Sequence, residues 1–388
     1  MKKSNNRMIA PDIMKILACI FVVVIHHKAY RWETYNAENI GIHTMLFIVC
    51  ACVGFVSFLK ERKKGISFCF SLNKFVLPML VFFAYWLFKK FPVTVFIILS
   101  SYFMGKSLMK TEKPVNDWYK ASNVIPRILR FYLPFIPIFV LCILYKIFVL
   151  GYQYTPLEAV ARFILGGFKP GSYYLPILAQ LVLIFPVIYT LVVKFRVKSV
   201  IAFVIGTFVY DYLAANLGMS DIAYKFIIFR FAAHIALGAY ASVTEFTLSK
   251  KTGFTMLGIG FIYSFLCVYT SKWTPSIFFQ WQETSFVTAI YLYPVICFVM
   301  NRYRHCCYGT GKLSSVISAF AGATYHIFLV QLMFYTTFGF SLNEYIANYY
   351  VNMLVNLSLT IIPGIIYAHY SIPIENKLIS KLKYKLQK

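Results

Sequence analysis

The apolar segment DIMKILACIFVVVIHHK, near the start of the chain, contains side chains that could carry out acid–base chemistry. Lys15 and His26 are eleven residues apart, which on an α-helix corresponds to about 1100° of rotation and about 16 Å of rise. Their directions around the helix axis therefore differ by only about 20°, so the two side chains lie on one face of the helix without touching. A histidine can accept a proton near neutral pH, and a lysine can stabilise developing negative charge.

Two further ionisable residues accompany this pair. Asp12 lies about 60° around the helix from Lys15, near the inner membrane surface, where interfacial solvation or an ion pair would explain it. His27 directly follows His26. For His26 itself, the structural alternative is a histidine at the outer end of a helix, hydrogen-bonded to a lipid headgroup or a neighbouring carbonyl. Asp12 and His27 are candidate site-lining residues.

A second group of candidates is the arginine pair in NVIPRILRFYLPF. Arg127 and Arg130 are three residues apart and so lie on one face of a helix, near its cytoplasmic end. Two guanidinium groups on one face suit the oxygens of a phosphate, which makes the pair a candidate anion site. The alternative is that both arginines only anchor the helix on the positive side of the membrane.

Three further polar residues lie deep in apolar segments. Arg230 and His234, in YKFIIFRFAAHIALGAYAS, are one helical turn apart, and Arg230 is too far from a helix end to reach the interface easily. We expect a polar cavity around this pair. His326, in ATYHIFLVQLMFY, is expected to be a hydrogen-bonded packing residue that could also line the site. Asp211, near an outer helix end, is expected to be solvated.

The chain that must position these residues is strongly apolar. Of its 388 residues, 60% are hydrophobic and only 13% are charged, against roughly 25% charged in soluble domains. An ordinary soluble protein is therefore excluded. The net charge of +25 comes from short basic runs between apolar stretches, which argues against a nucleic-acid partner. The nine cysteines show no disulfide or zinc-site spacing, so we expect no metal.

About twelve apolar stretches approach the roughly 20 residues that a helix needs to cross a bilayer. The predicted fold is therefore an all-α, polytopic transmembrane helical bundle. The expected spans are 9–28, 42–59, 74–88, 91–109, 127–150, 173–193, 199–217, 223–243, 253–270, 284–300, 317–338 and 349–370. The first stretch carries charged residues and no cleavage site of small residues follows it, so we expect a retained helix rather than a signal peptide.

The distribution of the cations predicts the orientation. If the N-terminus is cytoplasmic, about 28 of the 38 cations lie in inner segments, as the positive-inside rule requires. Both termini are therefore expected in the cytoplasm. We expect residues 1–374 to form a single integral domain of the cell membrane. Residues 375–388 are expected to form a basic cytoplasmic tail, which serves as a topological anchor or, alternatively, lies on anionic lipid.

Several segments together resemble the acyltransferase 3 family, integral-membrane enzymes that O-acylate glycans and other acceptors. The first apolar segment is similar to the family's first helix, in which a basic residue, ten intervening residues and a histidine form a signature that Lys15 and His26 match. VIPRILRFYLPF resembles the family's RxxR helix, with Arg127 and Arg130 at the two arginine positions. Further segments that resemble the family are IILSSYFMGKSL, GSYYLPILAQLVLIFPVI, RFAAHIALGAY and ATYHIFLVQ.

The chain also departs from the family's usual pattern. Gln180 stands where members commonly have Glu, and Gln331 stands where they commonly have His. Residues 42–90 resemble a two-helix insertion, so we expect about twelve spans in place of a family core of about ten. We expect no soluble esterase-like domain, such as some members carry, after the last helix.

The resemblance implies transfer of an acyl group from a cytoplasmic acyl-CoA, with acetyl-CoA as the expected donor. The expected acceptor is a hydroxyl of a cell-surface polysaccharide or a lipid-linked saccharide. The resemblance further implies that Arg127 and Arg130 hold the CoA phosphates and that His26 is the general base, or carries a transient acyl group. Lys15 or Arg230 would stabilise negative charge. No bound cofactor is expected.

Two other functions remain open. A transporter or flippase of lipid-linked saccharide or polysaccharide would fit a basic, polytopic protein with intramembrane arginine and histidine. Against it, the two halves of the sequence show no matching pair of helices broken by Gly or Pro, and a transporter does not need the spacing of Lys15 and His26. A glycan polymerase is a third possibility, and it would change the length of the glycan chains.

Overall fold

A computed structural model describes residues 8–28, 92–110, 115–168, 172–269, 286–308, 311–337 and 348–387, together with several single positions. These ranges are almost entirely helical, and within them the only β-type pairing is an isolated bridge between Met8 and Cys307. The all-α prediction is therefore confirmed. The expected insertion at 42–90 lies almost wholly outside the described residues.

In chain order, the helices are α1 (Ala10–Lys28), the helix Pro92–Lys110, α5 (Val115–Trp118), α6 (Ala121–Phe148), α7 (Pro156–Ile164), α8 (Tyr174–Phe195), α9 (Val197–Asn216), α10 (Asp221–Phe226), the 3₁₀ helix η1 (Ile228–Phe231), α11 (Ala232–Thr244), α12 (Lys250–Tyr269), α13 (Phe286–Arg302), α14 (Lys312–Thr336) and α16 (Tyr349–Gln387).

Six helices in the described part of the chain are long and apolar enough to cross a membrane. They are Pro92–Lys110, α6, α8, α9, α14 and the larger part of α16. Large apolar side chains such as Phe148, which is 80% exposed, point outward from these helices, as contact with lipid requires. The chain is therefore an all-helical membrane protein. The span count of about twelve and the cytoplasmic termini stay predictions.

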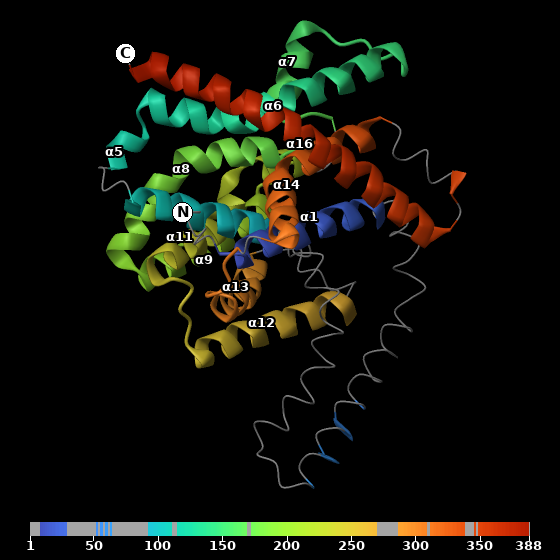
Figure 1. Ribbon diagram of the computed structural model, residues 1–388. Coiled ribbons are helices and arrows are strands. Elements are labelled where there is room, and N and C mark those ends of the chain that lie inside the picture. Colours follow the sequence, from blue (N-terminus) through green and yellow to red (C-terminus); the bar gives the residue numbers. More distant parts are fainter. Residues whose placement is uncertain are drawn as a thin grey trace.

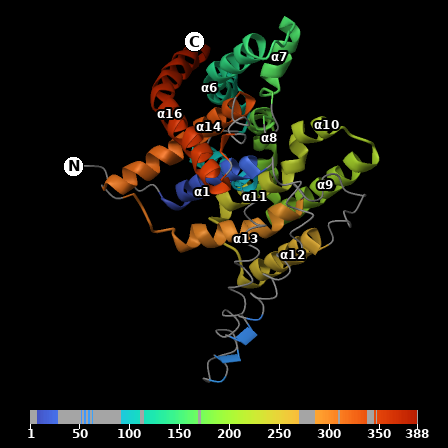
Figure 2. The same cartoon turned by 90° about the vertical axis from the view of Figure 1, so that its right-hand side faces the viewer.

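The bundle is built around α1. Helix α1 lies near the centre and contacts α14, α16 and α13 (Figures 1 and 2). Helix α12 packs on α13 at one edge, whereas α6 and α16 lie at the opposite edge with α7 beyond them. The central position of α1 places its polar side chains inside the bundle, where neighbouring helices can reach them.

Several helix ends meet on one face of the bundle. The backbone N–H of Ile9, just before α1, donates to the carbonyl of Cys306, just after α13, at 3.0 Å. Glu245, at the end of α11, forms an ion pair with Lys106 and lies 3.9 Å from Arg304. The charge pattern assigns all of these ends to the cytoplasmic side, so this packing is compatible with the predicted topology.

Two glycines allow neighbouring helices to approach closely. A Cβ atom on Gly238 of α11 would overlap the carbonyl oxygen of Ile98, on the helix Pro92–Lys110. A Cβ atom on Gly364 of α16 would lie 2.6 Å from the Cα atom of Ile327 on α14. Small residues at such crossings bring membrane helices into direct backbone contact. Gly364 thus sets the distance between α14 and α16.

The predicted boundaries differ from the structure at three places. The helix at the predicted span 127–150 begins earlier than expected, because α6 starts at Ala121. The helix of the last predicted span, 349–370, continues as α16 to Gln387 and includes most of the predicted basic tail 375–388, whose cytoplasmic location stays a prediction. The connection between the predicted spans 127–150 and 173–193 contains α7, whose start is fixed by a capping box of Thr155 and Glu158. Hydrogen bonds from the backbone N–H and hydroxyl of Thr155 lower the pKa of Glu158.

The structure differs most from the prediction at the expected span 223–243, which is not one continuous helix. The chain forms α10, becomes extended at Ile227, and resumes as η1 and α11. The side-chain amide of Gln180, on α8, bridges this break. It donates to the carbonyl of Phe226 at 2.7 Å and accepts from the N–H of Ile228 at 3.1 Å. A break inside a membrane domain is tolerated where protein groups satisfy the freed backbone, and Gln180 does so here.

Candidate active site

His26 lies near the end of α1, and its ring orientation is fixed by a backbone carbonyl. The Nδ1 atom is 2.8 Å from the carbonyl oxygen of Val22, one turn earlier in the helix. A carbonyl can only accept, so Nδ1 carries the proton and donates it. In the neutral ring, Nε2 is then the basic nitrogen. This is the tautomer that a general base needs when it acts through Nε2.

Helix α14 contributes two neighbours to this histidine. The side-chain amide of Gln331 donates to the same Val22 carbonyl at 3.3 Å. The ring of Tyr335, one turn further along α14, has its centroid 6.3 Å from that of His26. His26 therefore lies against the C-terminal part of α14. A hydrogen bond to a neighbouring carbonyl is also what the structural alternative predicted. The side chain of His27 lies outside the described residues.

Lys15 has a different environment at the other end of α1. Its Nζ atom is 3.2 Å from Oδ1 of Asp12, and it lies 4.8 Å from the ring centroid of Phe103. The hydroxyl of Tyr308 donates to Oδ2 of the same carboxylate at 2.8 Å. Asp12 is only 1% exposed, so the ion-pair explanation is correct for it and interfacial solvation is not.

The distance between the two signature residues follows from the helix. Because α1 is continuous from Ala10 to Lys28, Lys15 and His26 remain about 16 Å apart along its axis. The sequence correctly placed them on one face without contact. The structure thus places His26 near the C-terminal end of α1 against α14, and it pairs Lys15 with a carboxylate near the N-terminal end of α1.

The arginine pair lies on the first turns of α6. The guanidinium carbon of Arg127 is 3.4 Å from the ring centroid of Trp118, so the two groups are in direct cation–π contact. Trp118 is itself held by a hydrogen bond from its indole N–H to the carbonyl of Val182, at 2.9 Å. Among the described residues, Nη1 of Arg127 has no hydrogen-bond partner, although it is buried. Arg130 is exposed.

This arrangement leaves Arg127 with unused hydrogen-bonding capacity. A guanidinium that contacts an aromatic ring still has N–H donors directed away from that ring. A buried donor without an acceptor is costly, so the arrangement favours an anion that enters from outside the protein. Arg130, one turn later, adds a second positive charge to the same face of α6.

Arg230 lies directly after the helix break and is 1% exposed. Its guanidinium carbon lies 4.7 Å from the ring centroid of Tyr224, 4.8 Å from Phe231 and 5.5 Å from Tyr173. Its Nε and Nη1 atoms contact no acceptor in the described part of the chain. The sequence predicted a polar cavity here, whereas the contacts of the guanidinium in the structure are mainly aromatic rings.

Two nearby polar residues are also buried. Asp211 is 1% exposed and accepts a hydrogen bond from the hydroxyl of Tyr224 at 2.8 Å, so the expectation of a solvated residue is wrong. The reason is that α10 folds back over the end of α9. His234 lies one turn after Arg230, and its Nε2 atom is 3.3 Å from the hydroxyl of Thr288 on α13.

His326, on α14, is the buried packing residue that the sequence predicted. Its Nε2 atom is 2.9 Å from Oε1 of Glu375 and 3.3 Å from the hydroxyl of Ser371, both on α16. The ring also packs edge-on against Tyr367. These contacts join α14 to α16, and they account for His326 without a role in the reaction.

Comparison with known proteins identifies the family. The family model of the acyltransferase 3 family, described as an acyltransferase domain, matches residues 8–369, nearly the whole chain. The chain belongs to this family. No curated protein and no solved structure matches the chain significantly. As a member of the acyltransferase 3 family with an all-helical membrane domain, the protein is a membrane acyltransferase.

The structure also shows contacts in this acyltransferase that the sequence did not predict. Trp118 contacts Arg127, and Tyr308 binds Asp12. Gln180, which the sequence named only as a departure from the family's pattern, bridges the helix break. A tryptophan nine residues before an arginine could have suggested a stacked pair, because tryptophan is the preferred ring for a guanidinium. The other two contacts gave no local signal. Among the described residues, no cluster of His, Cys, Asp and Glu could hold a metal ion.

Proposed function

We propose that the protein transfers an acyl group, in the first place acetyl, from a cytoplasmic acyl-CoA to a hydroxyl of a cell-surface polysaccharide or a lipid-linked saccharide. Membership of the acyltransferase 3 family supports the reaction class. The observation that carries the proposal is the hydrogen bond from Nδ1 of His26 to Val22, because it presents a basic Nε2 on the first helix of the domain.

In the proposed reaction, Nε2 of His26 removes the proton of the acceptor hydroxyl. The oxygen then attacks the carbonyl carbon of the thioester, so that a C–O bond forms and the C–S bond breaks. The departing thiolate takes up the proton held by His26, which restores the neutral imidazole. General-base catalysis of this kind typically contributes about 10²–10⁴-fold to the rate.

The donor would bind at the opposite end of the bundle. Arg127 and Arg130 lie on the first turns of α6, and the unused N–H donors of Arg127 suit a phosphate of CoA. The pantetheine arm would then carry the thioester into the bundle toward His26. A buried arginine such as Arg230 would stabilise negative charge strongly in this setting, because water is excluded around it.

The direct experiment compares the surface glycans of cells with and without the gene by mass spectrometry. The proposal predicts loss of an ester-linked acetyl group, with the glycan backbone and its length unchanged. Loss of the whole polymer would support the transporter instead, and altered chain length would support a polymerase. Loss of a succinyl or longer ester would keep the acyltransferase and change the donor.

A second experiment assigns the reaction to the purified protein. Membranes or proteoliposomes that contain the protein receive acetyl-CoA labelled in the acetyl group, and transfer to a saccharide acceptor is measured. The His26→Ala variant serves as the inactive control. Transfer that requires no acyl-CoA would contradict the proposed donor.

A further inference from the structure

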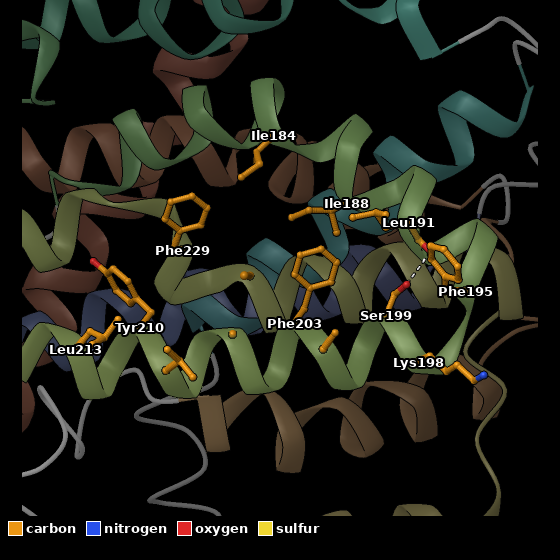
Figure 3. Close-up of a pocket in the computed structure, with 14 residues that line it drawn as sticks. Ile184, Ile188, Leu191, Phe195, Lys198, Ser199, Phe203, Tyr210, Leu213 and Phe229 are labelled. Carbon is orange, nitrogen blue, oxygen red and sulfur yellow. Dashed lines mark hydrogen bonds between the residues drawn. The ribbon is translucent and has the colours of Figure 1, made fainter.

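A long groove runs between α8 and α9, and neither His26 nor the arginine pair lines it. Its volume is about 680 Å³, within the range of about 300–1,000 Å³ that is usual for small-molecule sites. The side chains of Ile184, Ile188 and Leu191 reach into it from α8, and those of Phe203 and Tyr210 reach into it from α9 (Figure 3). Phe229, on η1, closes one end.

The floor of the groove is formed by small residues on one face of α9. Ser199, Ala202 and Gly206 recur at intervals of three and four residues, which places them on the same face. The hydroxyl of Ser199 donates to the carbonyl of Leu191 at 2.7 Å, so it is not left to bind a polar ligand. The groove is therefore suited to hydrocarbon rather than to a sugar or a nucleotide.

The length and direction of the groove match a lipid chain. It extends from Lys198, in the first turn of α9, to Leu213, near the end of that helix, a distance of about 22 Å at 1.5 Å per residue. Because α9 is one of the candidate membrane spans, the groove lies parallel to the acyl chains of the surrounding lipids. A single extended acyl chain has about this length.

The charge at one end identifies the headgroup. Lys198 is the only charged residue among the fourteen that line the groove, and it lies at one end (Figure 3). Two further exposed cations lie nearby, Lys194 in the last turn of α8 and Arg196 between α8 and α9. None of the fourteen lining residues is acidic. Three cations beside an apolar channel complement an anionic phosphate group.

We propose that the groove is a specific site for one anionic phospholipid, with its acyl chain between α8 and α9 and its phosphate at Lys198. The bound lipid belongs to the leaflet that faces the connection between these helices, which the charge pattern assigns to the cytoplasm. The site is separate from the proposed acyl transfer and does not depend on it.

The test uses native mass spectrometry of the full-length protein in detergent. The probes are phosphatidylglycerol and phosphatidylcholine with identical acyl chains, each added over a range of concentrations. The wild type should retain one phosphatidylglycerol at concentrations where phosphatidylcholine is not retained. Lys198→Gln should weaken phosphatidylglycerol binding about fivefold, since one lysine near anionic lipid contributes about 1 kcal/mol.

A second variant blocks the apolar part of the groove. A Cβ atom on Gly206 would meet no atom within 4 Å, so Gly206→Phe should fold normally and fill the groove. It should abolish retention of the first phosphatidylglycerol. The matched control is Ile201→Phe, because Ile201 is 54% exposed on the same helix and does not line the groove. The control should bind lipid as the wild type does.

Three results would overturn the proposal. These are equal retention of the two lipids by the wild type, unchanged binding in Gly206→Phe, and equal loss of binding in Gly206→Phe and Ile201→Phe. Thermal unfolding curves of all variants check that they are folded. A melting temperature for Gly206→Phe close to that of Ile201→Phe makes the comparison valid. For a Gly206→Phe variant that melts lower, the shorter Gly206→Leu replaces it.

Discussion

His26 of α1 and Gln331 of α14 donate hydrogen bonds to the same acceptor, the carbonyl oxygen of Val22, at 2.8 and 3.3 Å. The shared carbonyl links the orientation of the imidazole to the position of a second helix. Gln331 stands at a position where members of the family commonly have a histidine. In this chain, the residue is an amide donor that supports the ring without itself exchanging protons.

Replacing His26 by Ala should reduce acyl transfer by at least about 100-fold, because the proton acceptor is lost. The measurement is transfer of labelled acetyl from acetyl-CoA, normalised to the amount of inserted protein. His369→Gln is the control, since His369 is exposed on α16 and should leave activity unchanged. Retention of most of the activity in His26→Ala would exclude a catalytic role for this histidine.

Gln331→Met should lower kcat by about tenfold and leave the KM for acyl-CoA unchanged, because the apolar side chain fills the same space but cannot donate to Val22. A positioning residue acts through His26, so the pH profile of kcat should shift as well. Gln331→His keeps a donor and should retain more activity than Gln331→Met. Equal loss in both variants, with an unchanged pH profile, would indicate a purely structural residue.

Arg127→Ala should raise the KM for acyl-CoA by about tenfold or more, because a charge-assisted hydrogen bond to phosphate contributes about 1.5–3 kcal/mol. Trp118→Ala should raise it by a smaller factor through loss of the ring that orients Arg127. The exposed Arg162 of α7 supplies the control substitution, Arg162→Ala. An unchanged KM in Arg127→Ala would leave this arginine as a simple membrane anchor.

Gln180→Leu should destabilise the protein by about 2–6 kcal/mol, since the freed carbonyl of Phe226 and N–H of Ile228 lose their partner at about 1–3 kcal/mol each. The melting temperature in detergent measures this loss. Gln180→Glu keeps the acceptor for the N–H of Ile228, so its melting temperature should lie between those of Gln180→Leu and the wild type. If Gln180→Leu melts at the same temperature as the wild type, the side-chain amide of Gln180 does not stabilise the helix break at Ile227.

Gly364→Ala should destabilise the contact of α14 and α16 by about 1–3 kcal/mol, because the new methyl group overlaps the backbone at Ile327. Gly322→Ala, on α14, is the matched control, since a Cβ atom there meets nothing within 4 Å. The two melting curves should separate by several degrees. Coincident curves would show that α16 can move away from α14 at no cost.

Features that depend on local periodicity could be predicted from the residues alone. An apolar stretch of about 20 residues is sufficient to predict a membrane helix, so the all-α class and the six long apolar helices were predictable. Helical geometry also fixed the relation of Lys15 to His26, because both lie on one continuous helix. The pairing of Arg127 and Arg130 on one face has the same origin.

Features that depend on which helices are neighbours appeared only in the folded bundle. The break at Ile227 is supported by Gln180 on α8, and nothing in the apolar run YKFIIFRF marks it. Asp211 is buried because α10 packs over it, and the carboxylate of Asp12 is held by Tyr308, which is far away in the sequence. In a membrane, the hydrophobic pattern says that a helix inserts, but lipid and protein neighbours are equally apolar. Hydrogen bonds and close packing between helices therefore choose the partners, and these contacts join residues far apart in the sequence.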